Sequence, residues 1–91
     1  MYCTYVLLCV ETKRNRRKFY VGSTENIDVR ELQHKYKNVK TTKSFDKIDL
    51  VYFEMCLNKA DAIKRELQLK TGFGRGYIKR RIESYLKLVR V

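Results

Sequence analysis

The sequence contains no proline or tryptophan, one histidine, four glycines and three cysteines. With so little proline and glycine, no segment has the composition of a flexible linker. The cysteines, Cys3, Cys9 and Cys56, are odd in number and lack C-x-x-C spacing, which argues against both a disulfide framework and a zinc ribbon. We therefore expect a single domain over residues 1–91, in a reducing cytoplasm.

Apolar runs long enough to cross a membrane are also missing. The N-terminal run MYCTYVLLCV leads directly into a charged segment and has about half of the roughly 20 residues that a membrane helix needs. Its Tyr, Val and Leu content is typical of a buried strand. We expect no membrane partner.

Acidic residues are few relative to basic ones. Lys and Arg number 21 against 10 Asp and Glu, so the formal net charge is +11. Such an excess indicates a polyanionic partner, and nucleic acid is the leading candidate. The alternative, that the charge serves solubility, accounts for only part of this excess.

The basic residues fall into two groups along the chain. Five of the six residues from Lys13 to Lys18 are basic, and nine Lys or Arg lie between Lys64 and Arg90. We expect both groups to follow a phosphate backbone without reading its sequence. The candidate substrate-binding residues are Lys13, Arg14, Arg16, Arg17, Lys70, Arg75, Lys79 and Arg80.

Three segments have the composition of strands. Residues 2–10, 19–21 and 48–57 are rich in β-branched, aromatic and aliphatic residues. The second run stops at Gly22, and the basic loop before it is long enough to make the first two runs a hairpin. Residues 38–47 are polar and lack periodicity, so they are expected to form a loop.

Three helices are expected between and after these strands. The first begins after the capping residue Asn26 and ends near Asn38; the second begins after Asn58 and ends at Gly72. The third follows the glycine-rich TGFGRG, where Ile78, Ile82 and later apolar residues recur at helical spacing. The predicted order is β-β-α-β-α-α, an α+β fold.

Three residues could carry chemistry. Arg30 and His34 are four residues apart and share one helix face, which could bind a phosphate. Alternatively, this face is simply solvated. Glu66 flanks the apolar stripe of the second helix, where a half-buried carboxylate needs a partner. The alternative for Glu66 is an i, i+4 salt bridge with Lys70.

The chain resembles the GIY-YIG nuclease family over about residues 2–82. Cys3-Thr4-Tyr5 stands at the first motif, where the family's Gly and Ile are replaced, and Tyr20-Val21-Gly22 stands at the second. Arg30 and His34 match the family's helix pair, and ADAIKRELQLKTG contains Glu66 at the metal-binding position. An asparagine that several members carry nearer the C-terminus has no obvious match. The segment GFGRGYIKR is similar to the small stand-alone branch, whose members are like the N-terminal nuclease domain of the excision-repair nuclease.

The resemblance implies a three-stranded antiparallel sheet flanked by helices. It also implies a metal-dependent endonuclease that hydrolyses DNA, with little sequence specificity. Glu66 would hold one Mg²⁺ or Mn²⁺, and Arg30 would bind the phosphate. Tyr5 and Tyr20 would flank the attacking water together with His34, and which tyrosine is the general base stays open. Single-stranded, duplex and branched DNA all remain candidate substrates, and DNA repair is one candidate pathway.

Two alternatives compete with the nuclease. One is a non-catalytic nucleic-acid-binding module on the same fold, which would not need to retain Glu66. The other is a basic ribosome-associated protein, which explains the charge and leaves the order of the motifs as coincidence. The sequence is silent on the oligomeric state.

Overall fold

A computed structural model describes residues 1–35 and 42–89. The strands are β1 (Tyr2–Glu11), β2 (Arg16–Thr24) and β3 (Lys47–Cys56), and a 3₁₀ turn, η1 (Thr12–Arg14), joins the first two. The helices are α1 (Ile27–Lys35), α2 (Lys59–Leu69), α3 (Gly72–Arg81) and α4 (Glu83–Leu88). The strands form one antiparallel sheet in the order β2-β1-β3. The predicted α+β fold class, with helices flanking a three-stranded antiparallel sheet, is confirmed.

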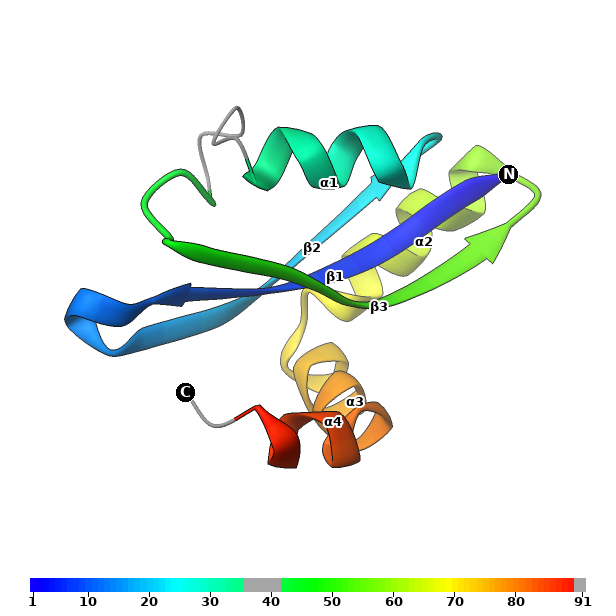
Figure 1. Cartoon of the computed structure of the whole chain (residues 1–91). Helices are drawn as coiled ribbons and strands as arrows, with labels where there is room; N and C mark the ends of the chain where they lie inside the picture. The colour runs from blue at the N-terminus through cyan, green and yellow to red at the C-terminus, as the bar shows by residue number, and fades with distance from the viewer. Residues whose placement is uncertain (36–41, 90–91) are drawn as a thin grey trace.

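The central strand β1 is buried on both faces. Every residue from 3 to 10 is buried, and alternate residues of a strand point to opposite faces. Tyr5 and Leu7 join the core on one face, and Val6 packs with Leu69 and Ile78 on the other. Figure 1 shows the matching arrangement, with α1 over one face of the sheet and α2 and α3 on the opposite side.

Both predicted capping residues begin helices. The Asn26 side-chain oxygen accepts a hydrogen bond from the backbone N–H of Val29 at 3.2 Å, and that of Asn58 accepts from Ala60 at 2.8 Å. Each satisfies a donor that the first turn leaves without an intrahelical partner. The predicted end of the first helix, near Asn38, lies outside the described residues. No helix in the described parts of the chain is both long enough and apolar enough to span a bilayer.

The C-terminal helical segment differs in detail from the expectation. The glycine-rich stretch is part of α3, because the Thr71 hydroxyl accepts a hydrogen bond from the Gly74 N–H at 3.1 Å and caps the helix. The helix α2 ends at Leu69, three residues before Gly72. At Ile82 the backbone leaves the helical region (φ −115°, ψ 29°), which separates α3 from α4. One predicted helix is therefore two short ones.

Close packing explains the glycine at position 74. A Cβ on Gly74 would overlap the backbone Cα, C and O atoms of Leu69. Backbone atoms cannot rotate away as a flexible side chain can, so α3 packs this closely on the end of α2 only when position 74 has no side chain.

We predict that Gly74→Ala destabilises the fold by about 1–3 kcal/mol, because the added methyl forces α3 away from α2. The melting temperature should fall by several degrees, about 4–8 °C per kcal/mol for a domain of this size. The matched control is Gly72→Ala, whose Cβ would lie 3.8 Å from the nearest atom, on the Arg75 side chain. Equal melting temperatures for the two variants would contradict the packing argument.

Candidate active site

Gly22 makes room for the side chain of Tyr5. The two residues are paired across β1 and β2, and a Cβ at Gly22 would lie 2.6 Å from Cζ of the Tyr5 ring. The ring therefore lies against Gly22, on β2, which is an edge strand of the sheet. This contact accounts for the glycine of the Tyr20-Val21-Gly22 motif.

The phenol oxygen of Tyr5 lies between two side chains of α1. Arg30 Nε donates to this oxygen at 3.1 Å, and His34 Nε2 lies 3.1 Å from it. Because a guanidinium can only donate, Tyr5 accepts from Arg30 and has its own proton available for His34 Nε2. His34 Nδ1 then donates to the Thr42 hydroxyl, 2.8 Å away. These contacts form one chain from Arg30 through Tyr5 and His34 to Thr42.

Burial divides the predicted catalytic residues into two sets. Tyr5 is 1% exposed and His34 is 0% exposed, whereas Tyr20 and Arg30 are partly exposed. The Tyr20 ring packs edge-on against His34, with 4.7 Å between ring centroids. Arg30 also donates to the Gln33 side chain at 3.0 Å. Tyr20 and Arg30 can therefore meet a ligand, with Tyr5 and His34 behind them.

The surroundings shift the titration of the buried pair. Burial and the nearby Arg30 charge lower the pKa of His34 to about 4, so its imidazole is neutral at pH 7. Burial raises the pKa of Tyr5, although the hydrogen bond and charge of Arg30 act in the opposite direction. In the resting protein, the phenol is protonated and the imidazole can accept its proton.

Glu66 reaches the site from α2. Its carboxylate accepts hydrogen bonds from the Ser23 hydroxyl at 2.6 Å and from Lys70 Nζ at 2.7 Å. Burial acts to raise the pKa of Glu66, but the hydrogen bonds from Lys70 and Ser23, together with the positive charges of Lys70 and Arg30, lower it overall. The i, i+4 pair with Lys70 that the sequence offered as the structural alternative is thus present.

The five predicted catalytic residues form one group. The charge of Glu66 acts on Tyr5 as well as on Arg30, and Tyr20 contacts both Tyr5 and His34 through its ring. Residues from β1, β2, α1 and α2, up to about 60 positions apart, are therefore brought together at the β2 edge of the sheet.

The donor set fits a hydrated divalent ion better than a caged one. Among residues 1–35 and 42–89, no group of three or more His, Cys, Asp or Glu side chains could hold a metal. Glu66 offers one carboxylate, with the Ser23 hydroxyl beside it. Mg²⁺ usually keeps several waters and binds through one or two carboxylates plus substrate phosphates. Glu66 therefore suits an ion shared with a phosphate ligand.

The fold joins the two predicted basic surfaces in one groove of about 670 Å³. Arg17 of β2, from the first surface, and Arg75 and Lys79 of α3, from the second, line this groove together with Lys18. Leu8, Phe19 and Leu86 supply its apolar lining. A cationic groove with an apolar lining suits a phosphate backbone and its bases.

The other predicted substrate-binding residues lie elsewhere. Arg16 and Arg14 pair with Glu11, at 3.0 Å and 3.9 Å, and Lys70 is held by Glu66. Lys13 and Arg80 are exposed. Lys13 and Arg14 are in the hairpin turn η1, about 20 Å along β2 from Gly22 at ~3.3 Å per residue, so they lie well away from the catalytic group.

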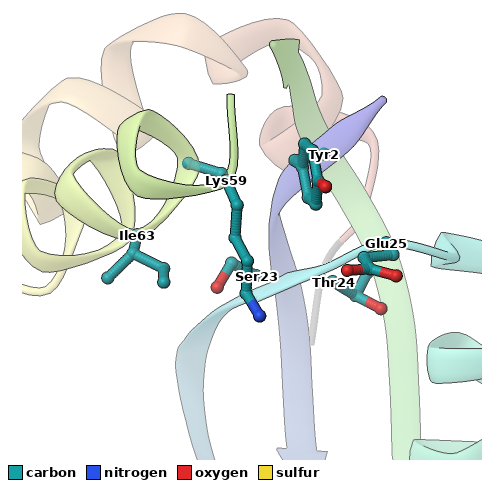
Figure 2. Close-up of a pocket in the computed structure, with 7 residues that line it drawn as sticks. Tyr2, Ser23, Thr24, Glu25, Lys59 and Ile63 are labelled. Atoms are coloured by element: carbon teal, nitrogen blue, oxygen red, sulfur yellow. The ribbon is translucent and has the colours of Figure 1, made fainter. Parts of the chain in front are cut away.

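A second, smaller hollow of about 260 Å³ adjoins the site. Figure 2 shows Ser23 and Lys59 side by side at this hollow, with Tyr2, Thr24 and Glu25 across from them. Because Ser23 also binds Glu66, the hollow lies directly beside the candidate metal ligand.

The sequence did not identify three side chains that support the site, Ser23, Gln33 and Thr42. Ser23 directly follows the Tyr-Val-Gly motif, so its place in the chain was a usable signal. Thr42 is eight residues from His34, across a segment without periodicity, and no pattern marks it.

Comparison with known proteins agrees with these motifs. The model of the GIY-YIG catalytic domain matches residues 1–81. The UPF0213 protein SH2523 of Staphylococcus haemolyticus is 34% identical over 68 residues, which cover 74% of this chain and 77% of that protein. The UPF0213 protein SERP0126 of Staphylococcus epidermidis is 32% identical over the same shares. No solved structure matches the chain significantly.

We predict that the lone histidine makes the fold sensitive to mild acid. The pKa of His34 is lowered to about 4 in the folded protein and is about 6.5 in an unfolded chain. The unfolded state therefore binds more protons between these values, and stability is lost as the pH falls from 6.5 toward 4, by about 2–3 kcal/mol. Urea denaturation at a series of pH values measures this loss.

His34→Gln is the control for this measurement. It removes the titrating group, so its free energy of unfolding should be lower at pH 7 but less dependent on pH than that of the wild type. Parallel pH dependences for the two proteins would show that His34 is not held neutral by the fold.

Proposed function

Because the chain belongs to the GIY-YIG family, whose members are nucleases, we propose that it is a metal-dependent endonuclease that hydrolyses DNA phosphodiester bonds. The observation that supports this most is the grouping of Arg30, two tyrosines and Glu66 at one edge of the sheet. Phosphodiester hydrolysis needs a positioned water, charge neutralisation at the phosphate and help for the leaving oxygen. Each need has a residue here.

Arg30 is the proposed phosphate ligand. Its guanidinium is oriented by Tyr5 and Gln33 and has more N–H donors than these contacts use. Because its planar fork matches two phosphate oxygens, Arg30 suits this role better than a lysine would. Its partial exposure leaves it accessible to the substrate.

Burial favours Tyr20 over Tyr5 as the residue next to the attacking water. Tyr20 is partly exposed, whereas Tyr5 is 1% exposed and already bound to Arg30 and His34. We propose that Tyr20 positions the water and accepts its proton, assisted by the Arg30 charge. Tyr5 and His34 orient Arg30 from behind, and the neutral imidazole provides a site for a proton from the Tyr5 phenol.

Glu66 would hold one Mg²⁺ or Mn²⁺, with water and phosphate oxygens completing the coordination. When bound, such an ion supplies Lewis-acid stabilisation of the phosphate and of the leaving 3′ oxygen. The lowered pKa of Glu66 keeps its carboxylate ionised and ready to bind a cation at neutral pH.

The remaining surfaces fit a DNA strand without sequence readout. We propose that the basic groove follows the backbone and that the hollow beside Ser23 accommodates the nucleotide next to the scissile phosphate. Among the described residues, Cys3, Cys9 and Cys56 are free thiols, which is consistent with action in a reducing cytoplasm, DNA repair being one candidate role.

The function is tested by cleavage of labelled single-stranded, duplex and flap DNA with Mg²⁺, Mn²⁺ or EDTA. We predict that the wild type cuts only with metal and that Glu66→Gln, which keeps the size of the side chain, loses at least about a hundredfold in rate. DNA affinity of the variant, measured on the same substrates, should stay within a few-fold. Binding by both proteins without cutting would instead identify a nucleic-acid-binding module.

A second prediction tests the groove. Replacing Arg75 and Lys79 with glutamine removes two phosphate contacts, so the slope of log Kd against log salt should fall by about 1.4 for single strands or 1.8 for duplex. The control replaces Lys43 and Lys47, two exposed lysines that do not line the groove. Fluorescence anisotropy measures both, and equal slope changes would show that the charge acts only through the overall field of the protein.

A further inference from the structure

Both oxygens of the candidate metal ligand are already engaged. Ser23 Oγ donates to Glu66 Oε1 at 2.6 Å, and Lys70 Nζ donates to Oε2 at 2.7 Å. A divalent ion must coordinate at least one carboxylate oxygen. Any ion that binds Glu66 therefore competes with one of these two donors.

The two donors differ in how easily they can leave. Ser23 lies in β2, where backbone pairing with Thr4 of β1 fixes its position, and its hydroxyl is neutral. Lys70 is the residue that ends α2, and its side chain is 49% exposed on a flexible stem. Its ammonium also repels a divalent cation. Lys70 is therefore the donor that a metal ion displaces.

Lys70 is well placed to give up Glu66 when DNA arrives. Glu66 is mostly buried, with 19% of its side chain exposed, and in the absence of metal it keeps its charge compensated by the Lys70 ammonium. Once displaced, a lysine at this site can pair with a phosphate oxygen instead. The carboxylate and the phosphate would then exchange partners, the first gaining the metal and the second the lysine.

We propose that Lys70 occupies the metal position of Glu66 in the metal-free protein and is displaced when the ion binds, while Ser23 holds the carboxylate in place. The inference rests on the proposed function only in taking Glu66 as the metal ligand. It makes Lys70 a displaceable counterion that links metal binding to the arrival of a phosphate.

The test is Mn²⁺ affinity, measured without DNA by electron paramagnetic resonance of the free ion. Lys70→Gln should lower the Kd for Mn²⁺ about tenfold, because the competing ammonium is gone. Ser23→Ala should raise the Kd, because the carboxylate is no longer held. Lys64→Gln, an equal change of charge at an exposed position of the same helix, should change the Kd less than about twofold.

Three results would overturn the inference: equal effects at positions 64 and 70, weaker binding by Lys70→Gln, or no Mn²⁺ binding by any of the proteins. Lys70→Met, which keeps the aliphatic stem, repeats the measurement without a new polar group, and thermal melting checks that each variant is folded. Cleavage assays separate this inference from the proposed function. Cleavage without a Lys70 effect on Mn²⁺ leaves the endonuclease and removes the counterion, and the reverse result does the opposite.

Discussion

The contact between the Tyr5 ring and Gly22 is the constraint on which the candidate site depends. Since position 22 has no side chain, a residue of the buried central strand can reach across the edge strand β2. Its phenol oxygen then meets Arg30 and His34 of α1. With any side chain at position 22, the phenol would be displaced and the hydrogen-bond chain through α1 would lose its central member.

The edge of the sheet also lets two separate cores contribute to one site. The α1 face supplies Tyr5, Tyr20 and His34, while the α2 face supplies Ser23 and Glu66. A site in the middle of the sheet could not combine them, because three packed strands would separate the two faces by the thickness of the backbone layer. At β2 the sheet ends, and the Glu66 charge acts on Tyr5 and Arg30 around that edge.

Much of the fold was predictable because its signals are local. The apolar run of β1, the caps at Asn26 and Asn58 and the spacing of Arg30 and His34 are each set by neighbouring residues. The start of α3 at Gly72 was not, since its glycines are tolerated only through packing of Gly74 on Leu69, a tertiary contact. The roles of Ser23 and Thr42 likewise depend on partners 43 and eight residues away, which no periodicity records.

Electrostatics gives the site an order of binding. The net charge of +11 produces a field that attracts a polyanion and opposes a free divalent cation, and Glu66, the one acidic side chain of the predicted catalytic group, already has Lys70 and Arg30 as compensating charges. A bound phosphate reverses this balance, because it adds negative charge beside the carboxylate and provides a new partner for the displaced lysine. In the proposed endonuclease, the DNA backbone therefore binds first and completes the metal site, so a protein with a single acidic ligand needs no larger cluster of carboxylates.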